Sequence, residues 1–258
     1  MTVNRERFRG KGAVVTGGSR GIGRSLALGL AREGANVCIS YLSHPDEAAS
    51  IVREMKDLGV EAFSYKIDQS DISQVEGFAN YAIEKLGKVH ALVNNAGICP
   101  FRGYFDIDPP LFEKVWKVNV ESHFFITQKI TSHMIDEKLK GRVLMISSIS
   151  SHVGGEFQTH YTPTKSALNG LVHSLSIVLG KHGILVNSLE PGTILTDINK
   201  EDLANLEKRS YMEKRISIGR LGTPDDMVGP ALFLLSEENS YSTGSELLAD
   251  GGMLVNLQ

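Results

Sequence analysis

Short apolar runs rich in Val and Ile alternate along this chain with longer amphipathic stretches, and this alternation restricts the possible folds more than any other feature. The runs are 13–15, 37–39, 62–67, 89–93, 143–146, 184–189 and 246–249. The stretches with the length and periodicity of helices are 22–33, 46–58, 72–86, 111–138, 166–181 and 224–235. Strands that are apolar on both faces belong to parallel sheets that helices cover on both sides. The sequence therefore predicts an α/β fold with a doubly wound parallel sheet of seven strands.

The chain carries no Pro/Ser-rich linker, repeat or low-complexity tract that would separate domains. A chain of 258 residues can bury about 70–75% of its unfolded surface, which suffices for one large core. We therefore expect residues 1–258 to form a single domain, with a cofactor half up to about residue 140 and a catalytic half over about 141–258. Residues 199–217 are expected to be a charged helical insertion before the last helix.

Charge and targeting signals exclude several classes of function. The net charge is −3, with 27 basic and 30 acidic residues, which gives no sign of nucleic-acid or membrane binding. Residues 1–11 are polar and basic without an apolar run behind them, and the longest uncharged stretch, 166–180, is too short and too polar to cross a membrane. Two cysteines, Cys38 and Cys99, are too few for a metal site, and we expect them to be idle thiols. The sequence predicts a cytoplasmic protein without a metal.

Glycine is over-represented, with 26 residues or about 10% of the chain against an average usage of about 7%. Gly17, Gly18, Gly21 and Gly23 lie within seven residues, after the first predicted strand and at the start of the first predicted helix. Without side chains, such a turn brings the backbone close to a pyrophosphate at the positive end of a helix. A plain strand-to-helix turn also uses glycine where φ is positive, but one glycine would suffice for it. The cluster favours a nucleotide site.

The residues after the second strand indicate which dinucleotide is bound. A site selective for NAD usually offers an acid to the ribose 2′-hydroxyl about 20 residues past the turn. Here the strand ends at Ser40 and Tyr41, and Asp46 is the next acid. Arg20, inside the glycine turn, could instead bind a 2′-phosphate, with help from His44. The pattern favours NADP or dual use over strict NAD, unless Arg20 is only a solvated loop residue.

Tyr161 and Lys165 lie four residues apart at the start of a predicted helix, so they share one face. Tyrosine is a poor base at neutral pH, and a nearby ammonium group favours the phenolate. Ser148 follows the strand 143–146, at the sheet edge where open α/β sheets bind ligands. Asn119 lies in the preceding helical stretch. Alone the Tyr–Lys pair is a weak signal, but these neighbours strengthen it.

Taken together, the motifs from about residue 10 to the C-terminus resemble those of the short-chain dehydrogenase/reductase family. The glycine turn 16–23 resembles its cofactor turn, 94–97 its Asn-Asn-Ala-Gly motif and 191–196 its Pro-Gly motif. The resemblance implies a single-domain Rossmann fold and a catalytic tetrad of Asn119, Ser148, Tyr161 and Lys165. The cofactor-binding residues that it implies, together with the local reasoning above, are Gly17, Ser19, Arg20, Gly21, Ile22, Gly23, Ser40, Tyr41, Asp68, Asn95, Ala96, Gly97, Tyr161, Lys165, Pro191, Gly192, Thr193, Ile194 and Thr196.

The family resemblance also implies a role for each member of the tetrad. Tyr161 exchanges a proton with the substrate oxygen, and Ser148 holds that oxygen. Lys165 lowers the pKa of Tyr161 and hydrogen-bonds the nicotinamide ribose. Asn119 positions a water that relays protons from Lys165. The nicotinamide exchanges the hydride with the substrate.

Four less generic stretches, 97–104, 148–160, 201–215 and 250–258, resemble those family members that oxidise the anomeric carbon of L-rhamnose to a lactone with NAD or NADP. A sugar site needs several hydrogen-bonding side chains and one apolar contact for the methyl group. The candidate substrate-binding residues are Ser148, Ser150, Gln158, Tyr161, Phe101, Thr193 and Asn199.

Two rival functions remain open from the sequence. The first is an NADPH-dependent reductase of 3-oxoacyl thioesters, whose acidic carrier protein would meet cations near the site. The cations available are Lys208, Arg209, Lys214, Arg215 and Arg220, largely offset by Glu201, Asp202, Glu207 and Glu213. The second is a catalytically idle nucleotide sensor, which the complete tetrad disfavours. The resemblance further implies a homotetramer, with interfaces on the closing helices and the C-terminal tail.

Overall fold

The computed structural model describes residues 6–256, and their strands form one sheet. The strands are β1 (Gly12–Val15), β2 (Asn36–Tyr41), β3 (Ala62–Lys66), β4 (Val89–Asn94), β5 (Arg142–Ile146), β6 (Leu185–Pro191) and β7 (Glu246–Ala249). Neighbouring strands are parallel throughout, in the order β3-β2-β1-β4-β5-β6-β7. The predicted seven-stranded parallel sheet is confirmed.

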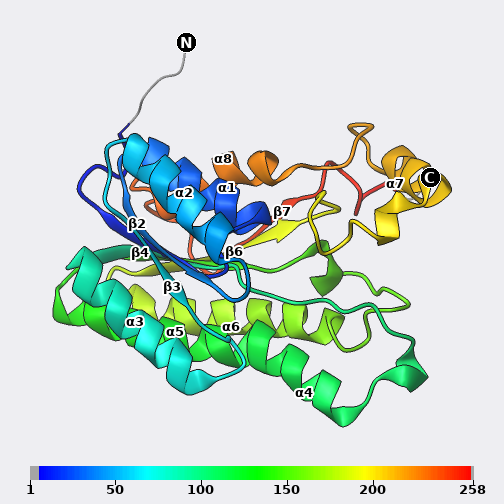
Figure 1. The fold of residues 1–258 in the computed structure, drawn as a ribbon, viewed down its shortest axis with the longest axis horizontal. Coiled ribbons are helices and arrows are strands. Elements are labelled where there is room, and N and C mark those ends of the chain that lie inside the picture. Colours follow the sequence, from blue (N-terminus) through cyan, green and yellow to red (C-terminus); the bar gives the residue numbers. More distant parts are fainter. Residues whose placement is uncertain (1–5, 257–258) are drawn as a thin grey trace.

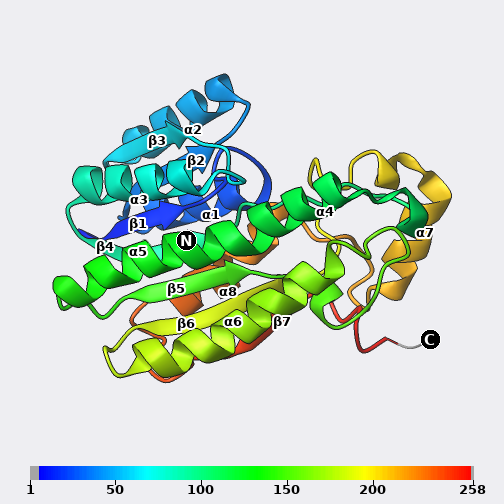
Figure 2. The same cartoon turned by 90° about the horizontal axis from the view of Figure 1, so that it is seen from below.

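Helices cover both faces of this sheet (Figures 1 and 2). The helices on one face are α1 (Gly21–Arg32), α2 (Pro45–Asp57) and α8 (Val228–Leu235), and those on the other are α3 (Ile72–Leu86), α5 (Ser122–Asp136) and α6 (Thr162–Gly180). Side chains alternate along β1 accordingly: Ala13 and Val15 join the core beneath α1, whereas Val14 joins the core beneath α3 and α5. The sheet is thus buried on both faces, which explains its continuous apolar strands.

The strand order reverses between β1 and β4. From β1 the chain builds outward through β2 and β3, and then returns to place β4 on the other side of β1. The loops that follow β1 and β4 therefore run to opposite faces, which leaves a crevice at their carboxyl ends. The glycine turn follows β1 at this point, so the topology positions it at the edge where doubly wound sheets bind ligands.

Two predicted helices are not uniform α-helices. The stretch expected as one helix over 111–138 consists of α4 (Pro109–Trp116), a π-helical turn (Lys117–Glu121) and α5. The stretch 224–235 begins with a 3₁₀ turn, Pro224–Met227, before α8. The insertion over 199–217 is helical as expected, with a 3₁₀ turn at Asp202–Ala204 and α7 (Leu206–Arg215). Hydrophobic periodicity could not reveal these changes of pitch, because each involves about one turn.

Among residues 6–256, no helix is both long enough and apolar enough to span a bilayer.

Candidate active site

The glycine turn packs tightly against the protein itself. Gly17 and Gly21 have φ of +62° and +55°, which other residues rarely adopt. A Cβ on Gly18 would lie 2.6 Å from Ile39 Cγ2, and one on Gly23 would lie 2.3 Å from the Gly17 carbonyl oxygen. The expected reason for these glycines was close approach to a pyrophosphate. Gly18 and Gly23 are needed for a further reason, because only without side chains does the turn fit against β2 and against itself.

Side chains from two strands fix the shape of this turn. Thr16 Oγ1 accepts hydrogen bonds from the backbone N–H groups of Asn95 and Ala96, at 2.9 and 3.0 Å. The Asn95 amide donates back to the carbonyl oxygens of Thr16 and Gly17, at 2.9 and 3.1 Å. From β2, the buried hydroxyl of Ser40 accepts from Gly17 N at 3.0 Å. Asn95 and Ser40, both predicted to bind cofactor, thus use their side chains to hold the turn.

The first turn of α1 is open to an anion. Helix α1 begins at Gly21 without a side-chain cap and without an acidic residue in its first turn. Its N–H groups and the positive end of its dipole are therefore available to a phosphate. Ser19, Ile22 and Gly23 lie at this helix start, as predicted.

Arg20 lies on the surface beside the glycine turn, with its guanidinium half exposed. Its Nη1 is 3.2 Å from Asp197 Oδ2 and 3.4 Å from His44 Nε2. The sequence left open whether His44 assists Arg20 or has no role, and the structure places the two side chains in contact. Asp197 was not predicted: it follows β6 in a loop that the contact ties to the glycine turn.

The predicted adenine-side residues lie at the ends of β2 and β3. Tyr41 ends β2 and is partly buried. Asp68 follows β3, and its Oδ1 accepts hydrogen bonds from the N–H and the hydroxyl of Ser70, at 2.8 and 2.7 Å. These bonds hold the pKa of Asp68 below its ordinary value, so its carboxylate is ionised at neutral pH.

Ser148, Tyr161 and Lys165 come together at the carboxyl end of β5. Ser148 follows β5, and its Oγ accepts from Ser150 N at 3.0 Å. Tyr161 immediately precedes α6, and its hydroxyl is hydrogen-bonded to Ser148. Lys165 Nζ lies 5.5 Å from the centre of the Tyr161 ring and donates to the carbonyl oxygen of Ile146 at 2.8 Å. The structure therefore brings together three of the four predicted catalytic residues around one point.

The electrostatics of this group differ from the expectation in one respect. We expected Lys165 to lower the pKa of Tyr161. Burial instead raises the pKa of Tyr161 above its ordinary value, and the bond to Ser148 opposes this only in part. Burial also lowers the pKa of Lys165 to about 8, so its charge is itself disfavoured. Desolvation therefore outweighs the attraction between the ammonium and the phenolate in the protein without its ligands.

Asn119, the fourth tetrad residue, is fully buried in the π-helical turn. Its Oδ1 accepts from Ile98 N at 2.9 Å, and its Nδ2 donates to Ile98 O at 3.0 Å and lies 3.2 Å from Thr164 Oγ1. Both ends of the amide thus hold Ile98, which follows Ala96 and Gly97. The side chain is occupied by these bonds, so a water that Asn119 positions would be bound by its backbone.

The shift at Lys165 predicts how stability changes with pH. Between about pH 8 and the ordinary value of 10.5, the unfolded chain binds a proton that the folded chain does not, so this group makes stability rise with pH. In Lys165→Met the contribution is absent. Over this window, the unfolding free energy of the wild type minus that of Lys165→Met should grow by on the order of 3 kcal/mol. Denaturant unfolding at both ends of the window checks this, and a constant difference would contradict it.

The predicted sugar-side residues form a polar wall next to Tyr161. Ser150 Oγ lies 3.5 Å from Gln158 Oε1, and Gln158 Nε2 lies 3.5 Å from Cys99 Sγ. Phe101 is partly buried in the same loop as Cys99. Cys99 was expected to be idle, yet it contributes to this wall and interacts with Tyr161. The only sequence signal was its place after the 94–97 motif.

The loop after β6 holds the remaining predicted residues. Gly192 allows the loop to pass Asp250, because a Cβ there would lie 2.7 Å from Asp250 Cα. Asn199 Nδ2 donates to Ile194 O at 2.8 Å, and its Oδ1 accepts from Thr196 N at 3.1 Å. Asn199 thus uses its side chain to close this loop. The loop's predicted members Pro191, Thr193, Ile194 and Thr196 lie in sequence order along it.

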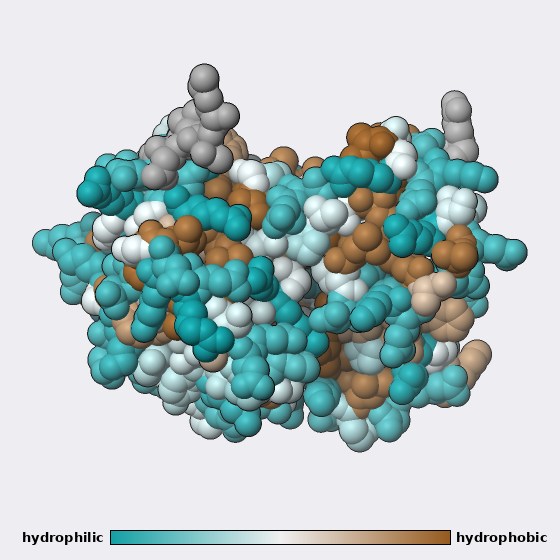
Figure 3. Space-filling view, turned by 45° about the horizontal axis from the view of Figure 1, so that its top comes forward, coloured by the Kyte–Doolittle hydropathy of each residue, from teal (hydrophilic) through white to brown (hydrophobic). Residues whose placement is uncertain are grey.

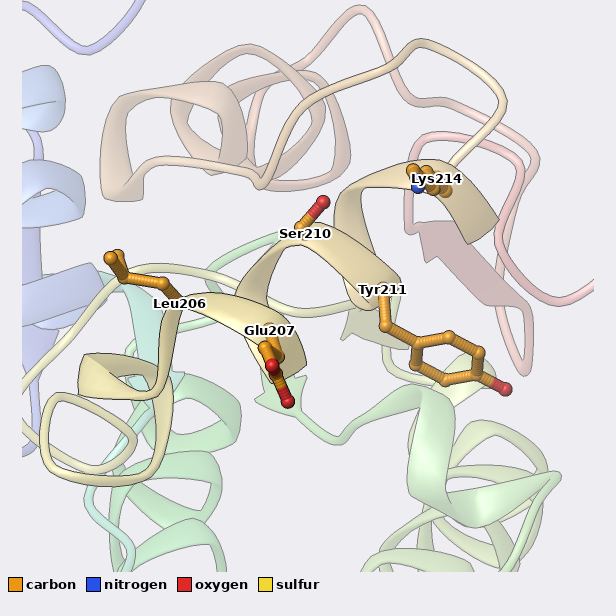
Figure 4. Close-up of a pocket in the computed structure, with 5 residues that line it drawn as sticks. All are labelled: Leu206, Glu207, Ser210, Tyr211 and Lys214. Carbon is orange, nitrogen blue, oxygen red and sulfur yellow. The ribbon is translucent and has the colours of Figure 1, made fainter.

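A hollow of about 420 Å³ lies along α7 (Figure 4). Its lining residues are Leu206, Glu207, Ser210, Tyr211 and Lys214. None of them was predicted to bind cofactor or substrate, and we assign it no function.

The chain is similar in sequence to proteins of known family over nearly its whole length. Residues 17–254 match the family model described as Enoyl-(Acyl carrier protein) reductase. The chain is 68% identical to an L-rhamnose 1-dehydrogenase (NADP(+)) of Thermoplasma acidophilum, over 97% of this chain and 99% of that protein. It is 49% identical to an L-rhamnose 1-dehydrogenase (NAD(P)(+)) of a Sphingomonas species, with the same coverage. It is 34% identical to a 3-oxoacyl-[acyl-carrier-protein] reductase of Staphylococcus aureus, over 95% of this chain and 98% of that protein.

A solved structure shows the same fold. A short-chain type dehydrogenase/reductase from Mycobacterium marinum superposes with a TM-score of 0.90 at 31% identity. The match covers 98% of this chain and 99% of that one.

Proposed function

The chain belongs to the short-chain dehydrogenase/reductase family, and on this premise we propose that it oxidises the anomeric carbon of L-rhamnose to the lactone, with NADP or NAD as the hydride acceptor. The observation that carries the proposal is the 68% identity to an L-rhamnose 1-dehydrogenase over 97% of the chain. The polar wall of Ser150 and Gln158 beside Tyr161 supports it, because a pyranose offers several hydroxyl groups to such side chains.

The dinucleotide would lie across the glycine turn. The uncapped start of α1 would bind its pyrophosphate, Arg20 a 2′-phosphate where there is one, and Asp68 the adenine end. The loop after β6, from Pro191 to Thr196, would hold the nicotinamide side. When bound, the oxidised dinucleotide supplies the hydride acceptor and a positive charge beside Tyr161.

The chain's own residues then hold the sugar and move its proton. Ser148 and Tyr161 would both hydrogen-bond the anomeric hydroxyl, since their own side chains are hydrogen-bonded to each other. Tyr161 takes the proton of the anomeric hydroxyl as the hydride leaves the anomeric carbon. The substrate thus loses two hydrogens in all. Lys165 favours the ionised Tyr161, and Asn119 holds the neighbouring segment at Ile98 in place.

The rival proposal, reduction of a carrier-bound 3-oxoacyl thioester, has less support. It needs free cations for an acidic carrier protein. Lys208 is instead paired with Asp202, and Arg209 Nε lies 3.0 Å from Glu213 Oε1. Arg220 is paired as well, with Asp226 at 2.8 Å. Ion pairs therefore already occupy several cations of this cluster.

A substrate panel tests the proposed function directly. Purified protein is incubated with aldoses, L-rhamnose among them, or with 3-oxoacyl thioesters, each with both dinucleotides, and nicotinamide absorbance is followed. We expect reduction of the dinucleotide with L-rhamnose and little change with thioesters. Turnover of the thioesters without turnover of any aldose would overturn the proposal and favour the rival.

Arg20→Ala should raise the KM for NADP about tenfold and leave the KM for NAD within about twofold. The reason is that only NADP carries the 2′-phosphate that the guanidinium would bind. Asp197→Asn is the matched control, because it removes the negative charge that faces Arg20 but keeps the cation. Steady-state kinetics with each dinucleotide give both values. An equal rise in the two KM values for Arg20→Ala would refute the assignment.

We further propose a homotetramer in the cytoplasm. Exposed apolar side chains support the assembly: Phe124 and Phe125 on α5, Ile177 and Val178 on α6, and Phe233 on α8. Figure 3, in which the side covered by α1, α2 and α8 comes forward, shows apolar groups scattered over a mostly hydrophilic surface. We infer that the interface would include α5 and α6 besides the closing helices and the C-terminal tail. Light scattering should give four times the mass of one chain, and a monomer at all concentrations would contradict this.

The proposed cytoplasmic location is supported by the state of the cysteines. Both cysteines, Cys38 and Cys99, are buried and unpaired, which fits a reducing compartment.

A further inference from the structure

A fully buried carboxylate lies at the end of β6. Glu190 is 1% exposed and directly precedes Pro191. It accepts a hydrogen bond from Asn169 Nδ2 at 2.6 Å and one from His152 Nε2 at 2.5 Å, and Ser151 Oγ lies 3.0 Å from it. Within residues 6–256, its recorded ion pair is to a histidine and not to a Lys or Arg. Since a buried carboxylate is costly without partners, its hydrogen bonds to Asn169, Ser151 and His152 compensate its burial.

His152 lies between two carboxylates. Its Nε2 is 2.5 Å from Glu190 Oε2 and 3.8 Å from Glu246 Oε2 on β7. The other titratable group at this cluster is His173 on α6, whose Nε2 is 3.0 Å from Glu246 Oε1. A carboxylate can only accept, so the Nε2 of His152 must carry a proton to bond Glu190. The imidazole of His152 thus donates into a cluster of two carboxylates, Glu190 and Glu246.

These contacts join the three segments that hold the proposed catalytic groups. His152 and Ser151 belong to the turn that begins at Ser148, and Ser151 N donates to Ser148 O at 2.9 Å. Asn169 lies on α6, one turn beyond Lys165. Glu190 itself leads into the Pro-Gly loop after β6. One carboxylate thus fixes the Ser148 turn against α6 and β6.

We propose that Glu190 is a positioning residue, and that its buried carboxylate, through its hydrogen bonds to His152 and Ser151, sets the position of Ser148 relative to Tyr161. The inference rests on the proposed function, in which Ser148 and Tyr161 share the substrate hydroxyl. Neither Glu190 nor His152 would touch substrate or dinucleotide. Their effect passes through the turn 148–152, whose displacement by about 1 Å can cost about 100-fold in rate.

The test uses Glu190→Gln, which keeps the shape of the side chain, and His152→Gln, at a side chain that is 34% exposed and tolerant of change. Each variant should lower kcat for the sugar about 100-fold and leave the dinucleotide KM within about twofold. The double variant should have the same kcat as the single variants. His173→Gln is the matched control: it removes a histidine from the same cluster without a contact to the Ser148 turn, and should keep kcat near that of the wild type.

The double variant separates positioning from plain loss of structure. If Glu190 and His152 act through one contact, the double variant should lose no more activity than either single variant, while the dinucleotide KM stays within about twofold. Additive losses in the double variant would overturn the proposal. So would loss of activity on chelator treatment of the wild type, since His152, Glu190 and Glu246 would then hold a metal ion.

A second readout does not depend on the reaction. Amide hydrogen exchange at Ser151 and His152, whose N–H groups bond Ser148 O and Ile149 O, should be faster in Glu190→Gln than in the wild type and unchanged in His173→Gln. Faster exchange without any sugar turnover in the wild type would refute the proposed function but support the role of Glu190. Unchanged exchange would refute that role.

Discussion

Replacing Tyr161 by Phe is expected to lower the turnover number by about three orders of magnitude while the dinucleotide still binds. The substitution removes only the hydroxyl that is hydrogen-bonded to Ser148, and the ring still fills its site at the start of α6. Lys165, 5.5 Å from the ring centre, then has no phenolate to stabilise. Without this hydroxyl, water would have to take the substrate proton, and it is a weaker and less ordered base.

Two measurements check this prediction. Initial rates with L-rhamnose give the turnover number, and fluorescence titration gives the dinucleotide affinity. Tyr104→Phe is the control, because Tyr104 is 66% exposed and carries no proposed role. Turnover of Tyr161→Phe within tenfold of the wild type would show that another group is the base.

The oxidation rate of the wild type should also depend on pH. Burial raises the pKa of Tyr161, so the ionised base is scarce at neutral pH and the oxidation rate should rise with pH. That rise should be absent in the Phe variant.

Gly23→Ala is expected to weaken dinucleotide binding about 100-fold and to destabilise the fold. A Cβ at this position would lie 2.3 Å from Gly17 O and 2.4 Å from Asn95 Nδ2. The turn must therefore open, and the Asn95 amide must give up its bonds to Thr16 and Gly17. Overpacking of this kind costs about 1–3 kcal/mol, and the opened turn no longer presents its N–H groups to a pyrophosphate.

Gly170→Ala provides the matched control. Gly170 lies inside α6, and a Cβ there would meet nothing within 4 Å. Alanine is the better helix former, so this variant should be as stable as the wild type or slightly more stable. Dinucleotide titration and denaturant unfolding of both variants decide the matter. If Gly23→Ala binds the dinucleotide normally, the turn is not the pyrophosphate site.

The secondary structure was predictable because burial on both faces leaves a simple trace in the sequence. Residues 143–146 of β5 form a continuous apolar run because both faces of the strand are covered. Helix α2 begins at Pro45 with Asp46 and Glu47 in its first turn, where their charges meet the helix dipole. These are local effects of single residues, and they do not depend on the rest of the fold.

The features that could not be predicted depend on contacts between distant segments. No residue type within Lys117–Glu121 predicts a π-helical turn, and the contact that Asn119 makes there is to Ile98, about 20 residues earlier in the chain. The pairing of Arg20 with Asp197 joins residues 177 positions apart. Glu190 is one of several polar residues in β6, and its partners are identifiable only when the Ser148 turn and α6 have been placed.

The tetrad residues and the residues of the polar wall lie on different kinds of structural element. Ser148, Tyr161 and Lys165 are fixed by the end of β5 and the start of α6, which belong to the rigid frame. Cys99 and Gln158 lie on the loops between these elements. We therefore expect substitutions at Gln158 to change which alcohol is accepted more than they change proton transfer. In evolutionary terms, such a separation would let one catalytic frame acquire new substrates through few changes.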